Sequence, residues 1–277
     1  MTSKRDSIVI LGAGYLARFM LSLTSFYQNV LQTSRDPDHR LTHLPRKQRL
    51  RFDLADSSTW SHIPSDADLL WCFPASPLPS VQQFASRINA RYRRLVVLAS
   101  TSAYDVGASH GYPPPWIDES APVHLEKPRV QGEEFLRTEC RAIALRVAGI
   151  YGPGRNPYDW IKTGRVALSD KYVNLIHVED LAAICEAALT CGVSGSAYNV
   201  SDGIPRTWQE IGRGLPEDEL VEPQAGMQKQ ISGKRLDTTK LRSLLKEARI
   251  TMRHPDLFRA LADLQRITVP SVNRAHE

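Results

Sequence analysis

An apolar strand that runs into a glycine-rich turn is the feature that most constrains how this chain folds. Residues 7–17 read S-I-V-I-L-G-A-G-Y-L-A, so a predicted strand leads into Gly12 and Gly14, and a predicted helix begins near Tyr15. Gly12 allows a sharp turn, Gly14 leaves the backbone open to a pyrophosphate, and the small Ala17 lets the helix pack on the strand. The first N–H groups of the helix favour a negative charge. The segment therefore predicts a dinucleotide-binding turn. Cofactor contacts are expected from Gly12, Gly14, Tyr15 and Leu16.

Short apolar strands alternate with helical segments through the first half of the chain. Strands are predicted at 7–11, 30–33, 50–52, 69–72, 95–98 and 143–147, and helices at 15–26, 80–91 and 130–137. This alternation predicts an α/β fold built on a Rossmann-type, doubly wound parallel sheet, with ligands beyond the carboxyl ends of its strands. Later in the chain, a helix is predicted at 178–189 and a strand at 197–200. We expect a nucleotide-binding domain over residues 1–155 with a return segment near 174–200, and a smaller, interleaved substrate lobe over residues 156–277.

Composition and charge argue against several classes of protein. The N-terminus lacks the apolar core of a signal peptide, and no apolar run approaches the roughly 20 residues that a bilayer requires. We therefore expect a cytoplasmic protein without a membrane partner. Lys and Arg total 35 against 30 Asp and Glu, and the basic cluster at 87–94 is better explained as the polar face of a helix, so no nucleic-acid partner is expected. The cysteines lack zinc-ligand or disulfide spacing, so no metal site is expected and the thiols are expected to be reduced: Cys72, Cys140, Cys185 and Cys191.

The end of the second predicted strand bears on the choice of cofactor. It reads V-L-Q-T-S-R, so Thr33 and Ser34 stand where a carboxylate would bind the ribose 2′-hydroxyl of NAD, and Arg35 is suited to a 2′-phosphate. This favours NADP over NAD; the alternative is that Arg35 is a surface residue and Asp36 supplies the acid. Asp53, just beyond the third strand, is placed either to bond an adenine amino group or to cap a helix. Two further cofactor contacts are expected from Leu54 and Phe73.

Six segments, in chain order, resemble the extended and atypical short-chain dehydrogenase/reductases, also called the NAD-dependent epimerase/dehydratase family. They are L-G-A-G-Y-L-A near the start, L-V-V-L-A-S-T-S-A-Y at 95–104, D-E-S-A-P at 118–122, L-R-V-A-G-I-Y-G-P-G-R at 145–155, N-L-I-H-V-E-D-L-A at 174–182 and A-Y-N-V at 197–200. The resemblance spans nearly the whole chain. It implies a protein that uses NAD(P) on a small, polar, sugar-nucleotide-like substrate. It also implies a homodimer formed through helices at 80–91 and 125–137.

The resemblance further implies a Tyr and a Lys four residues apart on one helix, and this chain departs from that pattern. Aligning Glu133 with the family's acidic residue places Arg129 at the Lys position and Leu125 at the Tyr position. Leucine has no proton to transfer, and the guanidinium of Arg129 can hold ribose hydroxyls but does not readily give up a proton. The sequence Tyr158-x-x-x-Lys162 follows the sixth strand, whereas the family's helix precedes it, so this pair is not expected to be catalytic.

Other residues are candidates for proton transfer or substrate binding. The resemblance places Ser100 at the family's catalytic hydroxyl, with Tyr104 as a reserve acid; the alternative is that Ser100 bonds its own backbone. Arg155, in G-P-G-R, is suited either to a substrate phosphate or carboxylate or to a surface ion pair. His177 is expected at a structural position near the lobe junction, and His124 is a weaker candidate for the vacated Tyr position. The catalytic candidates are therefore Ser100, Tyr104 and Arg129.

Two functions remain open on the sequence alone. One is an NADP-dependent oxidoreductase or epimerase with a non-standard acid. The other is a catalytically impaired, regulatory NADP-binding protein, which Leu125 favours.

Overall fold

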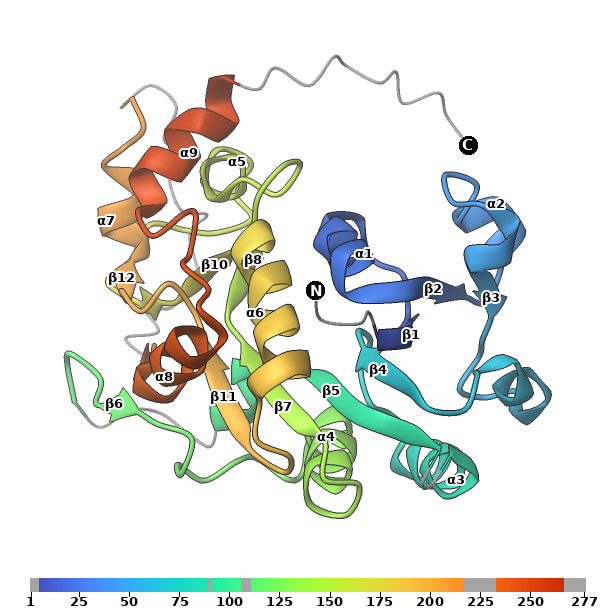
Figure 1. Ribbon diagram of the computed structural model, residues 1–277. Helices are drawn as coiled ribbons and strands as arrows, with labels where there is room; N and C mark the ends of the chain where they lie inside the picture. Colours follow the sequence, from blue (N-terminus) through green and yellow to red (C-terminus); the bar gives the residue numbers. More distant parts are fainter. Residues whose placement is uncertain (1–4, 89–90, 106–110, 217–232, 267–277) are drawn as a thin grey trace.

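The computed structural model describes residues 5–88, 91–105, 111–216 and 233–266, and a parallel sheet of seven strands forms its centre (Figure 1). The strands lie in the order β11-β7-β5-β4-β1-β2-β3, and every neighbouring pair is parallel. Their bounds are β1 (Arg5–Leu11), β2 (Tyr27–Ser34), β3 (Arg49–Arg51), β4 (Ala67–Trp71), β5 (Tyr92–Ser100), β7 (Ile143–Val147) and β11 (Ala197–Val200). The order reverses at β1, which is where doubly wound sheets bind their ligands. The predicted Rossmann-type fold is confirmed.

Helices cover both faces of this sheet, so its central strands are buried on both sides. Every residue of β4 and β7 is buried. On one face, Ile8 and Ile10 pack with α6 (Val178–Cys191), α8 (Thr239–Ala248) and the 3-10 helix η1 (Leu16–Ser22). On the other face, Val9 and Leu11 belong to the cluster that includes α3 (Leu78–Ile88), α4 (Pro128–Thr138) and the 3-10 helix η3 (Ser57–His62). Alternate residues of β1 thus serve two separate cores.

The helix after the glycine turn differs from the prediction. In place of one α-helix over 15–26, the chain forms η1 and then a single α-helical turn, α1 (Leu23–Phe26), with a kink at Met20 (φ −87°, ψ 28°). A 3-10 helix rises about 2.0 Å per residue against about 1.5 Å in an α-helix, and β2 begins directly after α1, at Tyr27.

The helix that resembles the catalytic helix of the family begins later than expected. α4 starts at Pro128, and Leu125 lies in the turn before it. Proline suits the first position of a helix and forces the residue before it into an extended conformation, which Lys127 adopts. The expectation of a helix from residue 125 is therefore wrong, and Leu125 does not share a helix face with Arg129. α3 also differs from the helix predicted at 80–91, because it begins at Leu78 and Arg91 is not helical, whereas residues 89–90 lie outside the described residues.

The remaining elements are short, and several build a third hydrophobic cluster (Figure 1, upper left). Three two-stranded sheets pair β10 (Leu175–His177) with β8 (Gly149–Tyr151), β12 (Arg206–Thr207) with β9 (Tyr172–Val173) and β13 (Arg235–Leu236) with β6 (Trp116–Ile117). The other helices are α2 (Pro37–Arg40), η2 (Arg46–Gln48), η4 (Thr101–Tyr104), α5 (Pro157–Lys162), α7 (Trp208–Gly212) and α9 (Leu257–Arg266). α5, α7 and α9 pack together, whereas α8 returns to α6 and β11. The predicted domain bounds stay a prediction.

The described residues bear on two expectations, one about membrane-spanning helices and one about the cysteines. None of their helices combines the length and the apolar character needed to cross a membrane. All four cysteines are free thiols, and burial raises the pKa of the Cys72 thiol to about 12.

Candidate functional site

A cavity of about 470 Å³ opens at the carboxyl ends of β1, β2 and β4. Six of the residues expected to contact a cofactor line it: Gly12, Gly14, Arg35, Asp53, Leu54 and Phe73. The side chain of Leu16 is instead buried in the core, and the ring of Tyr15 packs against the G-P-G-R turn. The sequence thus identified residues from four separate loops, which follow β1, β2, β3 and β4 and meet at one cavity. Their role in binding stays a prediction.

The glycine turn is held in place by the end of β2. The backbone N–H of Gly12 donates to Thr33 Oγ1 at 2.9 Å, and the N–H of Ala13 donates to the Thr33 carbonyl at 2.9 Å. Gly12 has φ +84°, and a Cβ added there would lie 2.8 Å from Phe73 Cδ1. A Cβ added to Gly14 would meet only the carbonyl oxygen of Gly12, at 4.0 Å. Gly14 is therefore open toward the cavity.

Two arginines lie at the part of the cavity next to β2. Arg35 and Arg40 both belong to its lining, and sequence reasoning had identified only Arg35. The carboxylate of Asp36 bonds Nδ1 of His39 at 2.9 Å, and Asp36 is outside the lining. The alternative in which Asp36 supplies an acid to the cofactor is therefore not favoured. Arg40 comes from α2, whose first residue is Pro37.

Asp53 is not a helix cap. η3 is capped by Asp56, whose side chain accepts from the N–H of Ser58. Asp53 Oδ1 accepts from the N–H of Ala55 at 3.0 Å in a tight turn, and Asp53 lines the cavity. Its position is compatible with the predicted contact to an adenine amino group.

Ser100 ends β5 and bonds its own chain. Its Oγ accepts from the N–H of Ser102 at 3.2 Å and caps η4. The backbone N–H of Ser100 donates to the carboxylate of Glu133, which also accepts from Arg129 Nε at 2.8 Å. Burial raises the pKa of Glu133, and Arg129 opposes this rise. Arg129 is thus engaged by a buried glutamate beside the backbone of Ser100.

Tyr104, the expected reserve acid, lies in a buried hydrogen-bond network. Its hydroxyl is buried, donates to Asn199 Oδ1 at 2.6 Å and accepts from Arg146 Nη1 at 2.7 Å. Arg146 also pairs with Glu134 at 2.9 Å. Burial raises the pKa of Tyr104, so its proton is held within this network.

Two lysines near Ser100 were missed by the sequence reasoning. Lys127 Nζ donates to the Ser102 carbonyl at 2.7 Å and to Asp105 at 3.3 Å. Lys234 Nζ donates to the Thr101 carbonyl at 2.8 Å and also pairs with Asp105. Burial lowers the pKa of Lys234, although Asp105 opposes this effect. No local spacing connects these residues, because they come from three distant segments of the chain.

The remaining candidates lie at the G-P-G-R turn or away from the cavity. The guanidinium of Arg155 lies 4.2 Å from the ring centre of Tyr15, whose hydroxyl donates to the Pro153 carbonyl at 2.9 Å. His124 pairs with Glu126 at 3.3 Å. His177 caps α6, and burial together with His254 lowers its pKa to about 4.

The comparisons with known proteins concern the fold. No protein-family model and no curated protein matches this sequence. Three solved structures illustrate the likeness. A functionally unknown conserved protein from Silicibacter pomeroyi is 22% identical, with a TM-score of 0.71 over 94% of this chain and 98% of that one. A putative NAD-dependent epimerase/dehydratase from Methylobacillus flagellatus is 21% identical, with a TM-score of 0.71 over 95% and 98%. MoeE5 in complex with UDP-glucuronic acid and NAD is 18% identical, with a TM-score of 0.70 over 95% and 100%. At these identities, the likeness establishes a shared fold, in agreement with the resemblance found in the sequence.

Proposed function

We propose that this chain is an NADP(H)-binding protein of the NAD-dependent epimerase/dehydratase family. The observation that carries the proposal is the cavity in which the Gly12–Gly14 turn lies together with Arg35 and Arg40. Two cationic side chains beside a glycine turn suit a dinucleotide that bears an additional phosphate. A neighbour of the same fold, described in complex with NAD, supports the binding of a dinucleotide.

The residues of the cavity fit the parts of this cofactor. Gly14 has no side chain and open space around it, so a pyrophosphate can approach the backbone of the turn closely. Asp53 is suited to the adenine amino group, and the guanidinium groups of Arg35 and Arg40 to the 2′-phosphate. When bound, the nicotinamide ring would supply or accept a hydride.

Arginine-to-alanine variants test the cofactor preference. We expect NADPH to bind at least about tenfold more tightly than NADH, because a hydrogen bond to a charged group contributes about 1.5–3 kcal/mol. Arg35→Ala and Arg40→Ala should each weaken NADPH binding and leave NADH binding unchanged in isothermal titration calorimetry. Arg46→Ala, an exposed arginine outside the cavity lining, is the matched control. Equal affinity of the unmodified protein for NADPH and NADH would refute the proposed phosphate site.

A reaction on a polar, sugar-nucleotide-like substrate is the second candidate function, and Lys234 favours it. A lysine whose pKa is lowered by burial, close to the strand end that carries Ser100, is typical of groups that transfer protons. In this proposal Ser100 bonds the substrate oxygen, and the pair of Lys127 and Lys234 takes over the proton transfer that Leu125 cannot perform.

The test is NADPH oxidation with a panel of carbonyl and sugar-nucleotide substrates. Since positioned acid–base catalysis contributes about 10²- to 10⁴-fold, Lys234→Met should slow turnover by at least about 100-fold, without weakening NADPH binding. Lys47→Met, at an exposed lysine, serves as the control. Tight NADPH binding without turnover on any substrate would instead support the regulatory, catalytically impaired alternative.

A further inference from the structure

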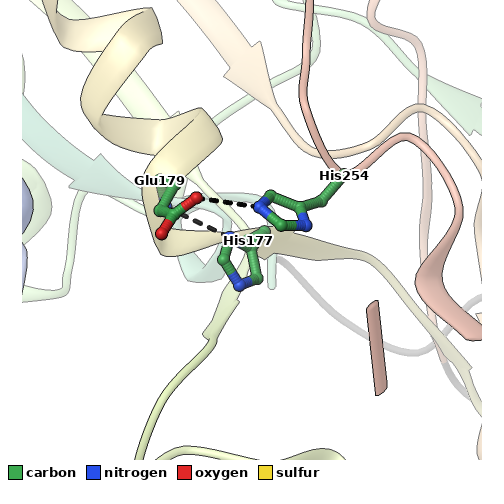
Figure 2. Close-up of side chains that lie close together, drawn as sticks. All are labelled: His177, Glu179 and His254. Carbon is green, nitrogen blue, oxygen red and sulfur yellow. Dashed lines mark hydrogen bonds and ion pairs between the residues drawn. The ribbon is translucent and has the colours of Figure 1, made fainter. Parts of the chain in front are cut away.

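Two histidines and a glutamate meet where α6 begins, outside the cavity described above. The potential ligand atoms of His177, Glu179 and His254 all lie within 4.8 Å of one another. His254 Nε2 lies 2.9 Å from Glu179 Oε2, and His177 Nδ1 accepts from the backbone N–H of Glu179 at 3.3 Å (Figure 2). Figure 2 shows these atoms turned toward one another from the start of the helix and from the loop that carries His254.

The hydrogen bonds already set the tautomer of the buried histidine. Because His177 Nδ1 accepts an N–H, it carries a lone pair and no proton, and this lone pair is on the side of the cluster. The bond is long, so a stronger partner can replace it. His177 is 3% exposed, whereas the side chains of His254 and Glu179 are 25% and 39% exposed. An ion from solvent therefore has access from the side of these two residues.

The loop that carries His254 is fixed by a neighbouring carboxylate. Asp180 accepts from the backbone N–H of Arg253 at 2.6 Å and from that of His254 at 3.0 Å. This contact holds the loop against the first turn of α6, so His254 approaches Glu179 in a defined register. Supporting hydrogen bonds of this kind are what positions ligands in metal sites. The carboxylates of Asp180 and Glu179 also make the start of α6 locally acidic.

We propose that His177, Glu179 and His254 bind a divalent ion of the zinc type, with a fourth position open to solvent. Two imidazoles and one carboxylate form a ligand set typical of Zn²⁺, whereas Mg²⁺ and Ca²⁺ require oxygen ligands. The rings of His177 and His254 are stacked, with centroids 3.7 Å apart and planes at 36°. The partly exposed ring of His254 must therefore turn so that its Nε2 and the Nδ1 of His177 reach the same ion. The ion replaces the hydrogen bond between His254 and Glu179.

Such an ion would fasten the loop before α9 (Leu257–Arg266) to α6. On its other side, His177 is close to the G-P-G-R turn, because a Cβ added to Gly152 would lie 3.5 Å from His177 Nε2 and 2.8 Å from the Tyr15 hydroxyl. The segment that holds Tyr15 thus adjoins the Nε2 side of His177, whereas the ion would bind on the Nδ1 side. The short-range spacing rules of the sequence analysis could not reveal it, since His177 and His254 are far apart in the chain.

The experiment uses the untagged, full-length protein after treatment with a chelator. Calorimetry should give one Zn²⁺ per chain with a Kd below about 10 µM, together with proton release, seen as a dependence of the binding enthalpy on the buffer. Co²⁺ should give the visible absorption of a four-coordinate site. His254→Ala and Glu179→Gln should each weaken Zn²⁺ binding by at least about tenfold, since even outer-shell partners have effects of that size. His43→Ala, at an exposed histidine outside the cluster, is the matched control.

Three results would overturn the proposal. They are no saturable Zn²⁺ binding by a folded protein, equal binding by the His254→Ala and Glu179→Gln variants, and an equal loss in the His43→Ala variant. Circular dichroism of each variant establishes that it is folded, and Glu179→Gln keeps the size of the side chain should His254→Ala fail to fold. Without saturable binding, the cluster is a metal-free contact between histidine and glutamate.

Discussion

At the scale of single residues, the two glycines of the turn have different functions. Gly12 is required by the fold, because its φ of +84° and the close approach of Phe73 leave no room for a side chain. Gly14 is open, and its nearest neighbour would be 4.0 Å from an added Cβ. The fold therefore does not require the absence of a side chain at Gly14, and in the proposed function this space is left for the cofactor.

This difference predicts opposite outcomes for two substitutions. Gly14→Val should change the free energy of unfolding by no more than about 0.5 kcal/mol and should abolish NADPH binding. Gly12→Ala should lower the free energy of unfolding by at least about 1–2 kcal/mol, because alanine is disfavoured at this φ. Urea unfolding and calorimetry measure the two effects, and each variant is the control for the other. Unchanged NADPH affinity in Gly14→Val would mean that the dinucleotide binds elsewhere.

At the scale of elements, α4 supports the loop between β4 and α3. A Cβ added to Gly132 would lie 1.9 Å from the carbonyl oxygen of Ala75, so only glycine permits this approach. The same loop contributes Phe73, Ser76 and Pro77 to the cavity. The fit of one helix against a backbone segment thus determines the shape of one wall of the site.

Gly132→Ala tests this contact. Overpacking of this kind typically costs about 1–3 kcal/mol, so we expect a loss of stability in that range, together with weaker NADPH binding as the loop is displaced. Gly111→Ala is the matched control, since a Cβ added there meets nothing within 4 Å. If thermal unfolding and NADPH affinity are the same in both variants, α4 does not position the loop.

The elements also show which parts of the fold the sequence could reveal. The segments at 143–147 and 197–200 predicted β7 and β11 to the residue, because a strand buried on both faces is mostly apolar; Arg146 and Asn199 are the polar residues within them. The helical pattern at 15–26 failed, since periodicity does not distinguish an α-helix from a 3-10 helix with a kink. Pro128 predicts the start of α4, because proline is favoured at the first position of a helix. The alignment with a family motif instead led to the prediction of a helix that begins at Leu125.

At the scale of the whole molecule, most unpredicted parts of the candidate site are contacts between distant segments; Arg40, which is close to Arg35 in the chain, is the exception. Lys127 and Lys234 meet at Asp105, and Arg155 packs on Tyr15. A local pattern can identify a glycine turn because all its residues lie within one segment. It cannot identify groups that only the folded chain brings together.

The last prediction concerns assembly through α3 and α4, which pack against each other. The resemblance implies a homodimer through these helices, and we propose one here. The outer positions of α3 are polar: Gln82, Gln83, Ser86 and Arg87. An interface without a large apolar centre associates weakly, so we expect an equilibrium between monomer and dimer at concentrations of ~1–100 µM.

Sedimentation velocity across that range should give a mass that rises toward twice that of one chain. The double variant Gln82→Asp and Gln83→Asp should remain monomeric, because a two-fold interface would bring the new charges of both copies together. Gln48→Asp, in η2, is the control and should still associate. A constant monomer mass for the unmodified protein would contradict the proposal, since the polar outer face of α3 would then simply be solvated.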